Sequence, residues 1–101
     1  MRSRLPHKRD RNQPEIISAF EAMGCTVFDS SAMGNGFPDL VVGMPGKSLL
    51  VEVKMPKGKF TTDQVRFFES WAGQYDSVSS VNDVVDLVKH YRARTNERRN
   101  G

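Results

Sequence analysis

Charged side chains stand at the ends of two runs that otherwise have the composition of buried strands. Residues 36–54 read GFPDLVVGMPGKSLLVEVK, two runs of strand-forming residues separated by a Pro-Gly pair. Asp39 begins the first run, and Glu52 and Lys54 end the second. A strand of Leu and Val gains no packing energy from a carboxylate, because burying a charge is costly unless it is paired. We therefore expect these three residues to serve chemistry.

A simple hairpin places the two carboxylates opposite each other. If the loop is centred on Pro45-Gly46, Asp39 lies across from Glu52 on the same face of the sheet, with β-carbons about 5 Å apart. Two like charges so placed destabilise a sheet unless a cation lies between them. Side chains alternate along a strand, so Lys54 shares this face with Glu52.

Two alternatives to this simple hairpin stay open. A Pro-Gly pair favours a type II turn, which is not the preferred two-residue connection, so a longer loop is open, and a bulge would shift the pairing. A symmetric lengthening leaves the pairing unchanged. In either symmetric case Val51 and Val53 alternate with Glu52 and are predicted to face the core.

Carboxylate oxygens of this kind suit Mg²⁺ or Mn²⁺, which take one or two carboxylates and leave positions for water or phosphate. Such an ion supports hydrolysis of phosphate esters, and Lys54 would orient the water or stabilise developing negative charge. Zinc is not expected, since His7 and His90 lie in the basic ends and the single cysteine, Cys25, offers no second thiolate.

Basic residues crowd both ends of the 101-residue chain, whose formal net charge is +3. Ten of the fifteen lysines and arginines lie there: Arg2, Arg4, Lys8, Arg9, Arg11, Lys89, Arg92, Arg94, Arg98 and Arg99. Basic ends on a compact body favour a polyanionic partner, because each contact with a phosphate releases counterions; ordinary solvated ends are the alternative. We predict a basic arm at residues 1–11, one domain at 12–92 and a basic tail at 93–101.

The composition also limits where the protein acts. No apolar run typical of a signal peptide or of a membrane span is present, so we expect a cytoplasmic protein with no membrane partner. A lone cysteine excludes an internal disulfide, and Cys25 is predicted to be a small buried residue.

Apolar periodicity and turn residues predict an α/β domain. The expected elements are a helix at 12–23, strands at 25–29, 38–43 and 48–55, a helix at 61–73, a strand at 77–80 and a helix at 81–94. This order, α-β-β-β-α-β-α, predicts a mixed β-sheet flanked by helices, whose last strand returns in parallel through a helical crossover.

Capping signals define the expected helix starts. Asn12 with Glu15, and Thr61 with Gln64, stand at capping-box spacing. The expected buried stripes are Ile16, Ile17, Phe20 and Met23 in the first helix, Val65, Phe67, Phe68, Trp71 and Ala72 in the second, and Val81, Val84, Val85, Val88 and Tyr91 in the third.

The ordered set of motifs resembles the VRR-NUC group of the PD-(D/E)XK nuclease superfamily. Pro38-Asp39 and Glu52-Val53-Lys54 lie in consecutive strands, within a G-x-G-x-P-D-L-V-V-G run and an L-L-V-E-V-K run. The resemblance covers residues 12–88, from NQPEI in the first helix through T-x-D-Q and Trp71. It implies a restriction-endonuclease-like core.

The resemblance also implies roles for single residues. Asp39 and Glu52 would hold the metal with the Val53 carbonyl, and Lys54 would assist the nucleophile. Glu15 matches a glutamate near the metal in the first helix, and Gln64 matches a glutamine of the second. Capping alone is an alternative explanation for both.

Short stand-alone relatives resemble Holliday junction resolvases. The resemblance therefore implies a homodimeric, Mg²⁺- or Mn²⁺-dependent endodeoxyribonuclease that cuts branched DNA in repair or recombination, in a bacterial or phage-infected cell. Three alternatives stay open: a less structure-selective nuclease, a restriction-like endonuclease, and a non-catalytic DNA-binding module. The last would show a damaged motif, whereas every acidic and lysine position is intact.

Overall fold

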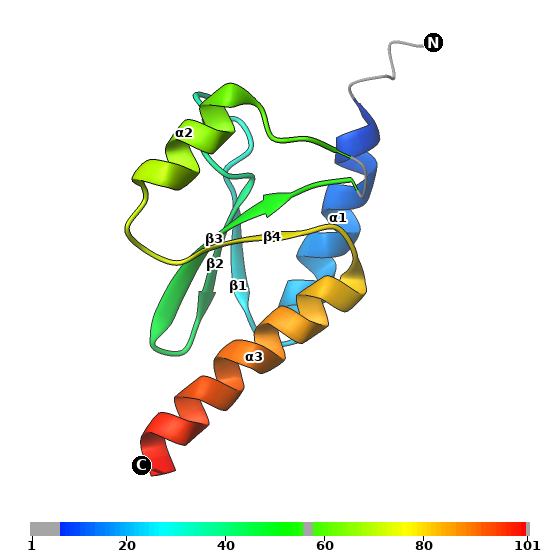
Figure 1. Cartoon of the computed structure of the whole chain (residues 1–101). Coiled ribbons are helices and arrows are strands. Elements are labelled where there is room, and N and C mark those ends of the chain that lie inside the picture. Colours follow the sequence, from blue (N-terminus) through cyan, green and yellow to red (C-terminus); the bar gives the residue numbers. More distant parts are fainter. Residues whose placement is uncertain (1–6, 56–57, 101) are drawn as a thin grey trace.

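A four-stranded mixed sheet organises the chain (Figure 1). The computed structural model describes residues 7–55 and 58–100. Its elements are α1 (His7–Ala22), β1 (Thr26–Asp29), β2 (Leu40–Met44), β3 (Lys47–Val53), α2 (Thr62–Ser70), β4 (Tyr75–Val78) and α3 (Val81–Asn100). They follow one another in the expected order. The strand order is β1-β2-β3-β4, with two antiparallel pairings and a parallel pairing of β3 with β4, as the helical crossover predicts.

The hairpin of β2 and β3 has the predicted register. Met44 pairs with Lys47 and Leu40 with Val51, so the loop is the two-residue Pro45-Gly46 and the longer loop is wrong. Gly46 has a φ of 79°, the left-handed conformation required at the third position of a type II turn.

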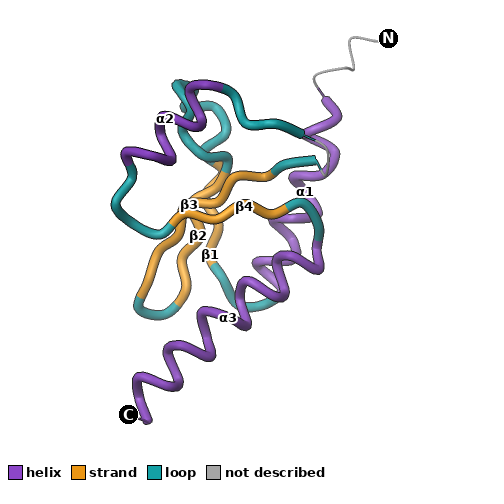
Figure 2. Tube along the Cα trace, viewed as in Figure 1, coloured by secondary structure: helices purple, strands orange, loops and turns teal. Residues whose placement is uncertain are grey.

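Two helices cover one face of the sheet. Figure 2 shows α1 and α3 on one side of the strands and α2 on the other. The buried core lies between the sheet and the helices α1 and α3 and comprises Ile16, Phe20, Cys25, Leu40, Val42, Met44, Leu49, Val51, Val53, Val78, Val84 and Val88. Val51 and Val53 thus face the core as predicted. Burial also raises the pKa of the Cys25 thiol, an effect that nearby Arg92 opposes.

The opposite face is only partly covered. We expected the apolar side chains of the helix at 61–73 to face inward, but Val65 and Phe68 of α2, and Trp71 directly after it, are each at least 40% exposed. α2 has nine residues and is the only described helix on this face of the sheet. Only the side of the helix that faces the sheet can be buried, so apolar residues on its other sides remain exposed. Phe67 is the better covered of its aromatic residues and contacts the rings of Phe37 and Trp71, with centroids 5.2 and 5.5 Å away.

Both terminal helices exceed their predicted bounds. α1 begins at His7, so Asn12 lies inside the helix and is not its cap; its Nδ2 donates a hydrogen bond to the Ser79 carbonyl 3.3 Å away. This tertiary contact outweighs the local start signal, and the helix continues through Pro14. α3 extends to Asn100 rather than to residue 94.

The third helix also presents fewer apolar residues to the core than expected. Val84 and Val88 are fully buried, whereas Val81, predicted to face inward, is exposed at the start of the helix. The division into an arm, a domain and a tail stays a prediction, because both terminal helices run across its boundaries. Residues 1–6 of the arm, Gly101 of the tail, and the side chains of 7–11 (His7 among them) and 95–100 lie outside the described part.

None of the helices within residues 7–55 and 58–100 has the length and apolar character needed to cross a membrane.

Two glycines in the loop before β2 should differ in how much stability is lost when each is replaced by alanine. Gly36 (φ 82°) and Gly34 (φ 74°) both adopt the left-handed conformation, but only at Gly36 would a β-carbon overlap the backbone carbonyl of Asp63, at the start of α2. Gly34→Ala meets open space, so it should cost about 1–2 kcal/mol of backbone strain. Gly36→Ala should cost at least about 2 kcal/mol more, because the backbone cannot yield cheaply.

Urea denaturation of the two variants measures this difference. Equal free energies of unfolding would show that the loop does not lie against α2 as described.

Candidate active site

Two buried carboxylates meet where the β2-β3 hairpin opens. Asp39 directly precedes β2 and is 5% exposed, and Glu52 in β3 is fully buried. Continuing the observed register by one residue places Asp39 opposite Glu52, as predicted. The Val53 N–H donates a hydrogen bond to Asp39 Oδ2 over 3.0 Å. The Asp39 carboxylate is therefore held against the end of β3.

A proline ends the ladder at this point. The same register sets Pro38 opposite Val53, and proline has no N–H to donate to the Val53 carbonyl. The N–H and C=O of one residue in an antiparallel strand project to the same side, so this carbonyl points toward the segment that carries Asp39. Ser30, which the sequence reading missed, fixes that segment: its Oγ donates to the Pro38 carbonyl and its N–H to the Asp39 carbonyl, each over 2.8 Å.

Gln64 connects the acid, the lysine and the helix start. Its Nε2 donates to Glu52 Oε2 over 2.7 Å, while its Oε1 accepts from Lys54 Nζ over 3.0 Å and from the Thr61 N–H over 2.8 Å. An ammonium and an amide N–H can only donate, and a carboxylate only accepts, so the partners determine the orientation of the Gln64 amide. The Thr61 hydroxyl completes the predicted capping box by accepting from the Gln64 N–H.

Lys54 lies at the same end of the sheet with 8% exposure. Besides Gln64, its ammonium donates to the Lys59 carbonyl over 2.8 Å and lies 5.0 Å from the centre of the Phe60 ring. An ammonium has three donors, and these contacts use two of them. The third can therefore serve a water or a phosphoryl oxygen.

Glu15 is not assembled with these groups. It is exposed on α1, and it does not cap that helix, which begins eight residues earlier. Within residues 7–55 and 58–100, no three His, Cys, Asp or Glu side chains gather closely enough to hold a metal ion. The structure therefore brings together Asp39, Glu52, Lys54 and Gln64, whereas a role for Glu15 stays a prediction.

The comparisons with known proteins agree with this geometry. No protein-family model matches the sequence, and a search of curated proteins finds no match. Among solved structures, one described as "VRR_NUC domain" superimposes with a TM-score of 0.70 at 34% sequence identity. The match covers 83% of this chain and 97% of that chain.

The chain belongs to the VRR-NUC family. Membership makes it a nuclease domain, for which DNA is the implied substrate. The four-stranded mixed sheet flanked by helices is consistent with that assignment.

The VRR-NUC domain has one further group beside its carboxylates that the sequence reading missed. The Tyr75 hydroxyl is buried and has no hydrogen-bond partner within the described part of the chain. Burial, together with the nearby negative charges of Glu52 and Asp39, raises the pKa of Tyr75 to about 12. Tyr75 was missed because the predicted strand started at residue 77, two residues after the observed one.

We expect Gln64→Leu to destabilise the VRR-NUC domain by about 3 kcal/mol, because it leaves buried donors and an acceptor unsatisfied. Gln74→Leu is the matched control. Its Nε2 makes a single exposed hydrogen bond to the Ser48 carbonyl, 2.9 Å away, so its loss should cost under about 1 kcal/mol. Urea denaturation gives both values, and similar losses would contradict the connecting role of Gln64.

Tyr75 can report on the charge of the carboxylates. The chain has two tyrosines, so in a Tyr91→Phe variant all tyrosinate absorbance comes from Tyr75. We expect ionisation near pH 12 in the folded protein against the ordinary 10.0 in urea. Because the folded-state pKa is the higher one, the free energy of unfolding should fall as the pH rises through this window.

Adding Glu52→Gln should lower the pKa of Tyr75, since one negative charge that opposes tyrosinate is removed. The value should stay above 10, because burial remains. Ultraviolet titration measures it, with circular dichroism to verify that the fold persists. A pKa that Glu52→Gln leaves unchanged would place the hydroxyl away from the carboxylates.

Proposed function

We propose that this VRR-NUC domain is a metal-dependent, structure-selective DNA endonuclease that hydrolyses phosphodiester bonds, with branched DNA such as four-way junctions as its substrate. The observation that carries the proposal is the convergence of Asp39, Glu52 and Lys54 at one end of the sheet, where Gln64 bridges Glu52 and Lys54 and the Val53 N–H holds Asp39. We also propose that the sheet is a restriction-endonuclease-like PD-(D/E)XK core, which the order of its elements supports.

The donor set suits a hard divalent cation. Asp39 and Glu52 supply carboxylate oxygens, and the Val53 carbonyl faces a proline that cannot donate to it. Oxygen donors of these types are those that Mg²⁺ and Mn²⁺ prefer. A bound Mg²⁺ would polarise the phosphoryl oxygen, lower the pKa of a bound water and neutralise developing charge. Glu15, which the structure does not assemble with this group, stays a proposed further ligand.

Lys54 is the proposed catalytic cation. Its two hydrogen bonds to the Lys59 carbonyl and Gln64 fix the ammonium, and its remaining donor can orient the attacking water or stabilise a phosphoryl oxygen. Gln64 is a positioning residue, because it holds Lys54 and Glu52 at once.

The start of α1 and the end of α3 lie at opposite ends of the domain (Figure 1). The Asn12 contact with Ser79 sets the start of α1 beside the end of the sheet where β3 and β4 finish. Lys47 at the start of β3 instead contacts Tyr91, in the second half of α3. A seven-residue strand separates the two places by roughly 20 Å. The ends can therefore contact separate stretches of DNA.

A homodimer would present two such sites to a branched junction. The exposed side chain of Trp71, directly after α2, supports a contact between copies, since a small domain has little core of its own. We propose repair or recombination in the cytoplasm of a bacterial or phage-infected cell as the setting.

Cleavage of labelled DNA tests the proposal. Matched four-way junction, splayed-arm and linear duplex DNAs are incubated with Mg²⁺, Mn²⁺ or chelator, and the mass is measured by light scattering at the same concentration. We expect paired, symmetric nicks in the junction, metal dependence and a dimeric mass. Asp39→Asn, Glu52→Gln and Lys54→Met should each lower the cleavage rate by at least about 100-fold, because each removes charge stabilisation in the transition state.

Glu69→Gln, an exposed carboxylate on α2, is the control and should cleave normally. Glu15→Gln tests the proposed third acidic residue and should slow cleavage. Cutting that survives Glu52→Gln would refute the active site. Metal-dependent cutting of every DNA would remove the junction selectivity, and binding without cutting would favour a non-catalytic DNA-binding module.

A further inference from the structure

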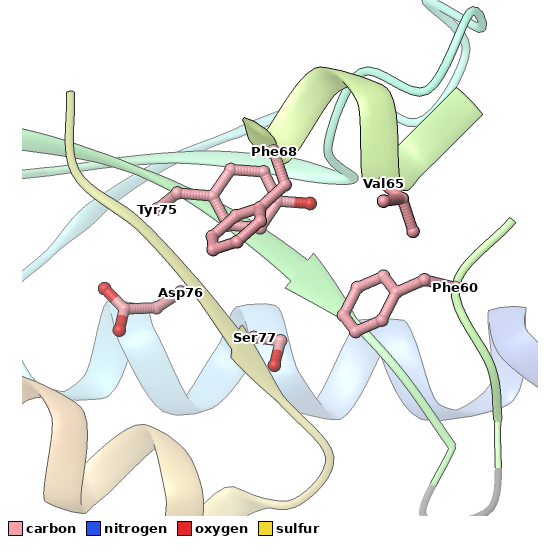
Figure 3. Close-up of a pocket in the computed structure, with 6 residues that line it drawn as sticks. All are labelled: Phe60, Val65, Phe68, Tyr75, Asp76 and Ser77. Atoms are coloured by element: carbon pink, nitrogen blue, oxygen red, sulfur yellow. The ribbon is translucent and has the colours of Figure 1, made fainter. Parts of the chain in front are cut away.

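A pocket of about 430 Å³ opens beside the active site, on the face of the sheet that α2 covers. Its lining residues come from three segments: Phe60 from the β3-α2 loop, Val65 and Phe68 from α2, and Tyr75, Asp76 and Ser77 from β4. Figure 3 shows the rings of Phe68 and Tyr75 on one side and that of Phe60 on the other, with Val65 above the Phe60 ring and Ser77 lower in the view. The volume is within the range of roughly 300–1,000 Å³ seen for small-ligand sites.

The pocket is continuous with the proposed catalytic groups. Ser77 pairs with Glu52 in the parallel ladder, so one strand spacing of about 4.8 Å separates their backbones. The Lys54 ammonium lies over the Phe60 ring, 5.0 Å from its centre. In α2, Gln64, which binds Glu52, directly precedes Val65. A nucleotide beside a phosphate at the active site is therefore next to the pocket.

The walls have the chemistry of a base-binding site. Phe60 and Phe68 line the pocket and are 43% and 52% exposed, so both aromatic side chains have surface that a ligand can contact. The Phe68 ring is oriented by an edge-to-face contact with Tyr75, with centroids 5.0 Å apart and planes at 69°. Ser77 adds an exposed hydroxyl that can donate to or accept from a polar base edge.

The charge around the pocket also suits a nucleotide. The Asp76 carboxylate is turned to α3, where it accepts a hydrogen bond from the Tyr91 hydroxyl over 2.8 Å. Lys54 lies at the rim, and exposed Lys59 and Arg66 adjoin lining residues in the sequence. Cations beside an aromatic surface match a phosphate next to a base.

We infer that this pocket binds an unpaired nucleobase of the substrate DNA, stacked between Phe60 and Phe68, next to the phosphate that is cut. This inference rests on the proposed function and deepens it, because it gives a reason for selectivity. Bases in an intact duplex are paired and stacked, so only DNA with unpaired nucleotides at a fork, junction or end presents one at low cost.

The test measures equilibrium binding in chelator, so no cleavage is needed. The probe is a splayed-arm DNA, compared with linear duplex of matched sequence. Phe60→Ala and Phe68→Ala should each weaken binding to the splayed arm by roughly 5- to 100-fold, the loss expected for one stacked base. Their salt dependence should be unchanged, because no phosphate contact is removed. Duplex binding should not change.

Phe28→Ala is the matched control, since Phe28 is 63% exposed on β1, the opposite edge strand of the sheet, and should bind as the parent does. An abasic scan then identifies the base. Removal of the base at one unpaired position should weaken binding to the parent protein and to Phe28→Ala. The same removal should not weaken binding to Phe68→Ala, because that variant already lacks the ring on which the base stacks.

Three outcomes would overturn the inference: no position coupled to Phe68, equal losses with Phe28→Ala, or a dimer that Phe68→Ala converts to a monomer, which would show that a second copy fills the pocket. Failure of the proposed function gives a different result. The coupled position would still be found, but the parent protein would not cut in Mg²⁺ or Mn²⁺.

Discussion

The site and much of the fold depend on one carboxylate with no exposed surface, that of Glu52. A buried acid is tolerated only when polar groups compensate it, and the Gln64 amide supplies a direct hydrogen bond. That amide is itself fixed by the Thr61 N–H and the Lys54 ammonium. The start of α2, the end of β3 and the acid therefore form one polar unit. Loss of one member of such a network destabilises the fold, because its partners are left buried without a hydrogen bond. When the network is complete, it holds each of these side chains in one position.

This polar unit explains how α2 is attached to the sheet. Its first turn is held by hydrogen bonds and by the close approach of the Gly36 loop, and Phe67 adds aromatic contacts. The remaining apolar side chains are left partly exposed. A soluble domain seldom exposes such a patch without a use, because it invites association. Attachment through polar groups thus leaves an aromatic surface accessible beside the end of the sheet that carries Glu52 and Lys54.

Particular residues show what local patterns can predict. The pairing of Asp39 with Glu52 followed from two-residue alternation and from a Pro-Gly turn, both properties of neighbouring residues. The Thr61-Gln64 capping box was confirmed for the same reason. Asn12 failed as a helix start, because its side chain contacts Ser79, which is 67 positions away in the chain. Val81 and Phe68 were placed inward by periodicity, which does not report whether another element covers that face.

The sequence by itself determined the element order, the hairpin register and the face shared by Asp39, Glu52 and Lys54. Each of these depends on backbone geometry over a few residues or across one tight turn. Only the tertiary structure decided that Gln64 bridges the acid and the lysine, that the Tyr75 hydroxyl lies buried near the carboxylates, and that an aromatic pocket opens beside them. These features depend on how α2 and β4 pack against β3. Such packing is set by the shapes of surfaces distant in sequence, which local patterns do not encode.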